Sequence, residues 1–142
     1  MFEKEQAIRA AITPENLHEK LKEMVAIDQA NRGRLIEIAT AGELRTGWDF
    51  YRAAIMFAHQ TEGDDVANMQ VALEFAITSM RLGCPIAPYT VARTYDRLLL
   101  TLGRGQRYGT QYGPDGALRP FDDGIVPMSG TVREQLDVPA RR

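Results

Sequence analysis

Apolar residues recur every three or four positions along most of the chain, which is the spacing of one face of an α-helix. Thr13 and Pro14 form a helix-start signal, and this spacing continues from there to about residue 40. Gly33 interrupts it, so the pattern predicts either one long helix with a weak point or two helices. Residues 1–12 show only weak helical spacing and are expected to form an N-terminal arm.

Three further helices are predicted over residues 48–60, 66–82 and 88–102. Each begins near a capping residue or a proline, and the last two end at Gly83 and Gly103, where glycine commonly terminates a helix. The connections are short, and short connections make successive helices antiparallel neighbours. The predicted fold is therefore all-α, with four to five antiparallel helices in a helical-hairpin array.

The pattern changes after Gly105. Residues 106–112 and 117–121 flank the turn sequence Gly113-Pro114-Asp115-Gly116, which predicts a small C-terminal β-hairpin. One helical turn is expected near residues 131–136. The predicted organisation is a single domain, 1–142, with a helical core over 13–103, a hairpin or loop over 104–121, and a loop and tail over 122–142.

Composition excludes several classes of protein. The hydrophobic fraction of 44% and charged fraction of 25% are ordinary for a soluble domain, and a net charge of -2 argues against a dedicated nucleic-acid binder. No apolar run is long enough to span a membrane, and the charged N-terminus lacks the apolar segment of a signal peptide. Cys84 is the one cysteine, so no intramolecular disulfide can form. These features predict a cytoplasmic protein, with no indication of its oligomeric state.

Hydrogen-bonding side chains are densest at and after the end of the last predicted long helix. The stretch has the spacing Asp-Arg-x5-Gly-x2-Gln-x-Tyr-Gly-Thr-Gln, and the residues at the fixed positions are Asp96, Arg97, Gly103, Gln106, Tyr108, Gly109, Thr110 and Gln111. Together with Asp28-Gln29 and Ala58-His59, this pattern resembles the signature of an uncharacterised bacterial family of small helical proteins, a domain of unknown function. The resemblance covers about residues 24–139. It implies a mostly helical fold and no particular activity.

Asp28, His59 and Asp96 each interrupt a helix face that is otherwise apolar. A charged side chain on such a face costs several kcal/mol unless it is paired. Natural partners are arginines, and they are Arg52, Arg93 and Arg97. Arg93 and Asp96 are three positions apart on one predicted helix and could bond directly.

One interpretation places these residues in a cleft between helices, with His59 and Asp96 as an acid–base pair. Arg52 and Arg97 would hold an anionic group, because guanidinium groups bind such groups through paired hydrogen bonds. Further hydrogen bonds would come from Gln106, Tyr108 and Gln111. The predicted function is a binding domain or small enzyme for a small anionic or amide-rich ligand.

The alternative is a non-catalytic protein-interaction module, in which the same polar residues form a structural network. Stacked helical hairpins commonly offer a face to a protein partner. Trp48, Tyr51 and Tyr89 are aromatic residues that could anchor such a partner.

Two other kinds of site have weak signals. Gly103-x-Gly105 has no preceding strand and no clear following helix, so it is not a phosphate-binding loop. The chain has no His-x-x-x-His or Cys-x-x-Cys sequence, and a triad of Asp28, His59 and Asp96 is the remaining candidate for a metal. Neither a metal nor another cofactor is predicted.

Overall fold

The computed structural model describes residues 1–59, 65–122 and 128–139. Within them the chain forms helices and no β-strand. The helices are α1 (Phe2–Ala10), α2 (Leu17–Thr40), α3 (Gly47–Ala58), α4 (Asp65–Arg81), α5 (Ala87–Thr101) and α6 (Gly130–Gln135). The all-α prediction is confirmed at this level.

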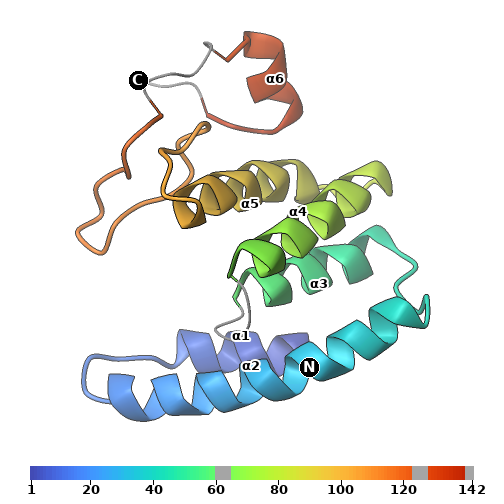
Figure 1. The fold of residues 1–142 in the computed structure, drawn as a ribbon, viewed down its shortest axis with the longest axis vertical. Coiled ribbons are helices and arrows are strands. Elements are labelled where there is room, and N and C mark those ends of the chain that lie inside the picture. The colour runs from blue at the N-terminus through green and yellow to red at the C-terminus, as the bar shows by residue number, and fades with distance from the viewer. Residues whose placement is uncertain (60–64, 123–127, 140–142) are drawn as a thin grey trace.

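The first five helices run in alternating directions, as Figure 1 shows. Helix α4 packs against both α3 and α5, and these three helices form the body of the molecule. Helices α1 and α2 form a hairpin along one side of the body, and α2 packs on α3 and also reaches α4. Helix α6 lies at the opposite end, beyond α5.

Alanine residues let the three body helices approach closely. Ala54 of α3, Ala76 of α4 and Ala92 of α5 have no exposed surface. Larger side chains such as Met56 and Phe57 fill the space towards α2, where Leu35 completes the core. Burial of such side chains contributes about 1.5–3 kcal/mol each, so this core is the main source of stability.

Helix α3 begins with a capping box, which fixes where the chain enters the body. The Thr46 hydroxyl accepts a hydrogen bond from the Asp49 amide at 3.2 Å, and the Asp49 carboxylate accepts one from the Thr46 amide at 2.8 Å. The hydrogen bonds that the Asp49 carboxylate accepts lower the pKa of Asp49, with the Thr46 amide as the largest cause. Next to the cap, the Ser79 hydroxyl donates to the Gly47 carbonyl at 2.6 Å and ties α3 to the end of α4.

Replacing Thr46 with alanine is expected to lower the free energy of unfolding by about 1 kcal/mol, because the Asp49 amide loses its acceptor. Urea unfolding monitored by circular dichroism measures the change. Thr40→Ala, at an exposed position in α2, is the matched control and should change stability by less than about 0.5 kcal/mol. Equal losses in the two variants would show that the cap contributes nothing.

The N-terminal end of the chain differs from the prediction. Residues 2–10, expected as an arm, form helix α1 and pack on α2. The helical spacing was weak because the inward face carries charge: Glu5 is buried with 2% of its surface exposed. Of the two alternatives at Gly33, the structure has the single helix, since α2 is continuous from Leu17 to Thr40.

The prediction of a C-terminal β-hairpin is wrong. Residues 106–121 form only two isolated bridges, between Gln106 and Phe121 and between Tyr112 and Leu118, and the first of these is parallel. The predicted turn is present, with the Gly113 amide donating to the Ala117 carbonyl at 2.8 Å. No strand forms before the turn, because backbone amides of the stretch that precedes it bind the Asp96 side chain of α5.

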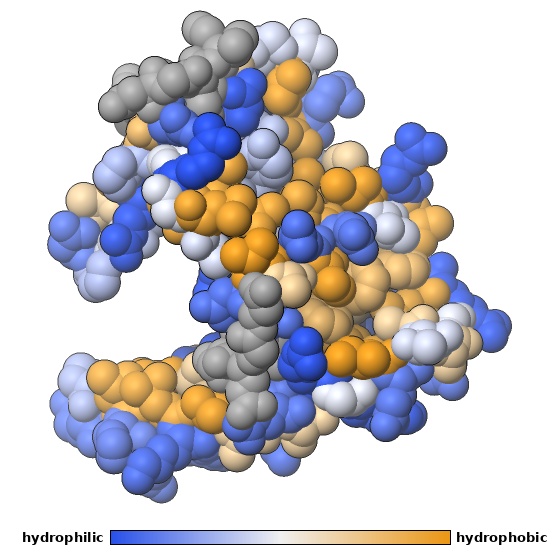
Figure 2. Space-filling model, in the orientation of Figure 1, coloured by the Kyte–Doolittle hydropathy of each residue, from blue (hydrophilic) through white to orange (hydrophobic). Residues whose placement is uncertain are grey.

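Helix α2 begins away from the body and leaves apolar side chains uncovered. Leu17, Leu21 and Val25 are exposed there by 45%, 45% and 37%. Figure 2 shows this apolar patch at the lower left. None of the helices in the described ranges is both long and apolar enough to cross a membrane.

Candidate functional site

Asp96 organises the stretch that carries the sequence signature. Its side chain lies on the inner face of α5 with no exposed surface. Oδ1 accepts hydrogen bonds from the backbone amides of Arg107 at 2.7 Å and Tyr108 at 2.8 Å. Oδ2 accepts from the Thr110 amide at 3.0 Å and from the Thr110 hydroxyl at 2.8 Å. The carboxylate therefore holds the loop in place and has no oxygen directed at His59.

Gln106 braces the same loop from inside. It is fully buried, and its side-chain amide donates to the carbonyls of Gln111 at 3.2 Å and Arg119 at 2.6 Å. Its Oε1 accepts from the Gln111 amide at 2.9 Å. Gly105 completes the packing, because a Cβ there would lie 2.3 Å from backbone atoms of Phe121. These contacts give Gln106 a structural role.

Tyr108 packs on α5 through its ring. The ring meets Tyr95 edge to face with centroids 5.7 Å apart. Burial raises the pKa of Tyr108, so its hydroxyl stays protonated at neutral pH. Its position in the loop is fixed by its backbone amide, which binds Asp96.

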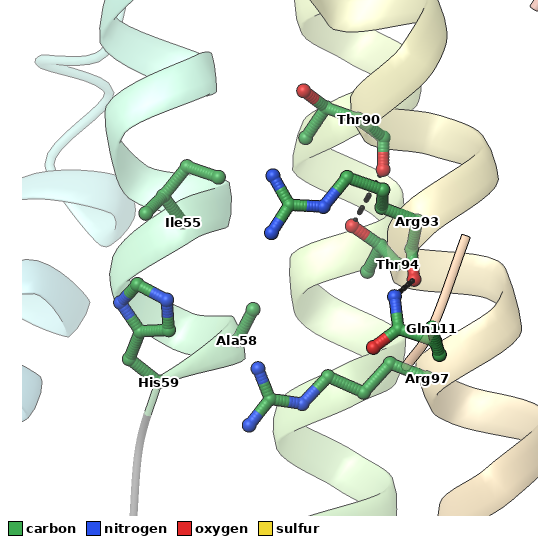
Figure 3. Close-up of a pocket in the computed structure, with 8 residues that line it drawn as sticks. All are labelled: Ile55, Ala58, His59, Thr90, Arg93, Thr94, Arg97 and Gln111. Atoms are coloured by element: carbon green, nitrogen blue, oxygen red, sulfur yellow. Dashed lines mark hydrogen bonds between the residues drawn. The ribbon is translucent and has the colours of Figure 1, made fainter. Parts of the chain in front are cut away.

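A cavity of about 30 Å³ lies between α3 and α5. Its walls come from both helices and from the loop after α5 (Figure 3), and they are Ile55, Ala58, His59, Thr90, Arg93, Thr94, Arg97 and Gln111. This volume has room for about two or three waters, or for part of a polyatomic ion. The loop reaches the cavity because the side-chain amide of Gln111 donates to the Arg93 carbonyl at 3.2 Å.

Two guanidinium groups make the cavity positive. Arg93 and Arg97 are four residues apart on α5, and both side chains extend towards α3 (Figure 3). Desolvation lowers the pKa of Arg97, and the neighbouring charges of Arg93 and Arg9 lower it further. The guanidinium remains charged at neutral pH, because its ordinary pKa lies far above that range. Among the described residues, neither arginine has a carboxylate within ion-pair distance, and the charge of Asp65, which raises the pKa of Arg97, is the smallest of the effects on it.

His59 lies at the end of α3 with its two ring nitrogens in different surroundings. Nδ1 is 2.8 Å from Oε1 of Glu5, on α1. The other ring nitrogen faces the cavity and the arginines (Figure 3). The imidazole therefore joins the N-terminal helix to the cavity wall.

Glu5 and Asp28 share one arginine beneath His59. Arg9 donates from Nε to Glu5 at 2.9 Å and from Nη2 to the two Asp28 oxygens at 3.1 and 3.0 Å. It also donates to the His59 carbonyl at 3.4 Å. Burial raises the pKa of Asp28, while the charge of Arg9 opposes this rise. The cluster of Glu5, Arg9, Asp28 and His59 connects α1, α2 and α3.

The structure brings three of the predicted site residues together at the cavity: His59, Arg97 and Gln111. It places Asp96, Gln106 and Tyr108 in the supporting loop, so the predicted pairing of His59 with Asp96 is not made. Arg52 faces α1 instead, 3.6 Å from Glu3 and over the ring of Phe2.

Other predicted partnerships also differ. Arg93 does not bind Asp96, because one side chain turns to the cavity and the other to the loop. Asp28 pairs with Arg9, which removes it from a triad with Asp96. In the parts of the chain that the structure describes, no three His, Cys, Asp or Glu side chains are placed to hold a metal ion.

Sequence reasoning missed Glu5 and Arg9 altogether. A four-residue spacing of Glu and Arg is a helix-stabilising pattern and was a usable signal for α1. Nothing in the local sequence indicates that this pair would meet His59, which is 54 positions from Glu5.

An open groove of about 490 Å³ adjoins the cavity. Arg97 and Gln111 line both, and the groove is also lined by Tyr112 and Arg119. Tyr112 is 59% exposed, so its ring is accessible from the groove. A ligand with a head group in the cavity therefore has space for a larger body next to it.

Comparison with protein-family models, curated proteins and solved structures finds no match for this chain. The resemblance to the uncharacterised helical family stays a prediction. Any function must therefore be argued from the geometry of the cavity.

Proposed function

We propose that this chain binds a small anionic ligand, of the phosphate type, in the cavity between α3 and α5. The observation that carries the proposal is the pair of guanidinium groups, Arg93 and Arg97, that share one cavity without a carboxylate partner in the described residues. Like charges one helical turn apart repel each other. An anion between them would remove that repulsion and form charge-assisted hydrogen bonds.

The donors around the cavity favour an oxyanion with several oxygens. Two planar guanidinium groups and the cavity-facing nitrogen of His59, when protonated, are separate hydrogen-bond donors around the cavity (Figure 3). A phosphate group offers that number of acceptors, whereas a single carboxylate offers two oxygens. The side-chain amide of Gln111 is held by the Arg93 carbonyl and so supports the wall.

The anionic head group need not be the whole ligand. The groove beyond Arg97 would accept an organic body, with Arg119 and the exposed Tyr112 beside it. We propose binding at this site without assigning a chemical reaction to it.

Inorganic phosphate is the simplest probe of the head-group site. Isothermal titration calorimetry at low salt should detect its binding to the wild-type chain. Arg93→Gln and Arg97→Gln should each weaken the affinity by roughly tenfold or more, since a hydrogen bond to a charged group contributes about 1.5–3 kcal/mol. Raising the salt concentration should also weaken binding.

A matched control is Arg34→Gln, because Arg34 is an exposed arginine on α2 that pairs with Glu37. It should leave phosphate affinity unchanged. Absence of phosphate binding to the wild-type chain, or equal losses in all three variants, would contradict the proposal.

The alternative function, a protein-interaction module, rests on exposed aromatic residues. Trp48 is 46% exposed, but it packs edge to face on Tyr51 at 5.7 Å. Tyr51 in turn meets Phe2 of α1 at 6.3 Å. These contacts give the aromatic residues a part in docking α1, so the cavity supports the ligand-binding function better.

A further inference from the structure

His59 borders the proposed anion site, and the role assigned to it here rests on that proposed function. Oε1 of Glu5 accepts a hydrogen bond from Nε of Arg9 at 2.9 Å and lies 2.8 Å from Nδ1 of His59. Because this oxygen acts as an acceptor, the geometry assigns a proton to Nδ1. In the neutral ring the lone pair then belongs to Nε2, the nitrogen that faces the cavity (Figure 3).

A phosphoryl group in the cavity would be held from both sides. Arg93 and Arg97 on α5 would bind its oxygens, and Nε2 of His59 on α3 faces them across the cavity. The two guanidinium groups would neutralise the charge that otherwise repels an electron pair approaching phosphorus. We propose that His59 is a phosphoryl acceptor, modified at Nε2 by a small donor with a reactive phosphorus–nitrogen or acyl-phosphate bond.

The step balances with phosphoramidate as the donor. The Nε2 lone pair forms a bond to phosphorus, the phosphorus–nitrogen bond breaks, and ammonia leaves with that electron pair. Phosphoramidate already carries the leaving group's protons, so no further proton moves. The ring keeps the Nδ1 proton and becomes a cation.

Glu5 is a positioning residue for this step. Its carboxylate faces the Nδ1 proton and is 2% exposed, so it stabilises the cationic ring in a site with little water. Arg9 and Asp28 hold that carboxylate and its helix in place. His18 offers an internal comparison, because it is an exposed histidine on α2.

The test treats the full chain with phosphoramidate and follows phosphohistidine by mass spectrometry and phosphorus NMR. We expect one phosphoryl group on Nε2 of His59. His59 should be modified faster than His18, by a factor of roughly ten or more. His59→Asn should abolish it. Arg93→Gln and Arg97→Gln should each slow it by roughly tenfold or more, while Arg34→Gln leaves the rate unchanged.

Glu5→Gln tests the positioning role, with circular dichroism to confirm folding. Nitrogen NMR of the His59 ring should show the Nδ1-protonated form in the wild-type chain and a weaker preference in the variant. As this preference weakens, the modification rate of His59 should fall, while the modification rate of His18 stays constant. A slower rate with an unchanged tautomer would overturn the assigned role of Glu5.

Phosphate titration of the same samples separates the two proposals. Phosphate binding without modification of His59 overturns the phosphoryl-acceptor role and leaves the anion site standing. If the wild-type chain neither binds phosphate nor is modified at His59, both proposals are overturned. Equal modification rates for His59 and His18, or rates independent of Arg93 and Arg97, also overturn the acceptor role.

Discussion

Replacing Asp96 with alanine is expected to lower the free energy of unfolding by about 3–5 kcal/mol. The variant leaves three backbone amides and the Thr110 hydroxyl without their acceptor. Each buried donor that loses its partner costs about 1–3 kcal/mol, although water entering the loop would recover part of this. Urea unfolding followed by circular dichroism measures the loss.

Two further variants grade this effect. Thr110→Val removes one donor and preserves the shape of the side chain, so it should cost about 1 kcal/mol. Asp115→Ala removes a carboxylate that accepts one exposed amide, from Ala117, and should cost less than about 1 kcal/mol. If Asp96→Ala were no more harmful than Asp115→Ala, the loop would not depend on the buried carboxylate.

The body helices could be predicted from sequence because their signals are local. Gly83 and Gly103 both adopt positive φ, at 79° and 73°, directly beyond the ends of α4 and α5. Thr46, which directly precedes an apolar segment, caps α3. Periodicity and end signals act within a few residues, so reading the chain in short windows recovers them.

The C-terminal loop could not be predicted in this way. The stretch from Gln106 to Tyr112 has the composition of a strand, and the turn after it forms. Its amides nevertheless bind Asp96, which lies 11 to 14 positions earlier in the chain. A buried carboxylate that accepts several amides outweighs the preference of a short, isolated hairpin.

Helix geometry explains which parts of the site were foreseen. Arg93 and Arg97 are four residues apart and share a face of α5, so the choice of Arg97 for anion binding agrees with its place in the cavity. Asp96 is adjacent to Arg97 and therefore points about 100° away. The partner of His59, Glu5, is set by where α1 packs on the rest of the chain, and no local sequence pattern predicts that position.

The N-terminal helix therefore belongs to the candidate site although it contributes no residue to the cavity wall. Glu5 touches the ring that faces the cavity, and Arg9 links Glu5 to α2. Any change that releases α1 would free the His59 ring to rotate. Removal of α1 should therefore affect the site through the His59 ring, whereas removal of Arg93 should affect it through the charge of the cavity.

Replacing Arg9 with alanine should have the second large effect on stability. Glu5 and Asp28 are exposed by only 2% and 1%, and Arg9 forms ion pairs with both. Removing the shared partner of buried charges costs about 3–5 kcal/mol. Arg34→Ala is the control, because its pair with Glu37 is exposed and contributes less than about 1 kcal/mol.

The stability loss of Arg9→Ala should also depend on pH, and the shifted pKa of Asp28 determines the direction of that dependence. Burial raises the pKa of Asp28 above its ordinary 3.8, so the folded state binds a proton more tightly than the unfolded state. This group's contribution to stability therefore decreases as pH rises from the ordinary pKa through the raised one. Arg9 lowers the pKa of Asp28, so its removal makes that decrease larger and extends it to higher pH.

Urea unfolding of the wild-type chain and Arg9→Ala between about pH 4 and about pH 7 tests this expectation, since the difference between them cancels groups that titrate alike in both. The deficit of the variant should be smallest at the acid end, where the protonated form of Asp28 is most populated, and should grow towards neutral pH. A deficit that is constant with pH would mean that Arg9 acts through packing alone, and that the charge of Asp28 has no part in holding α1 against His59.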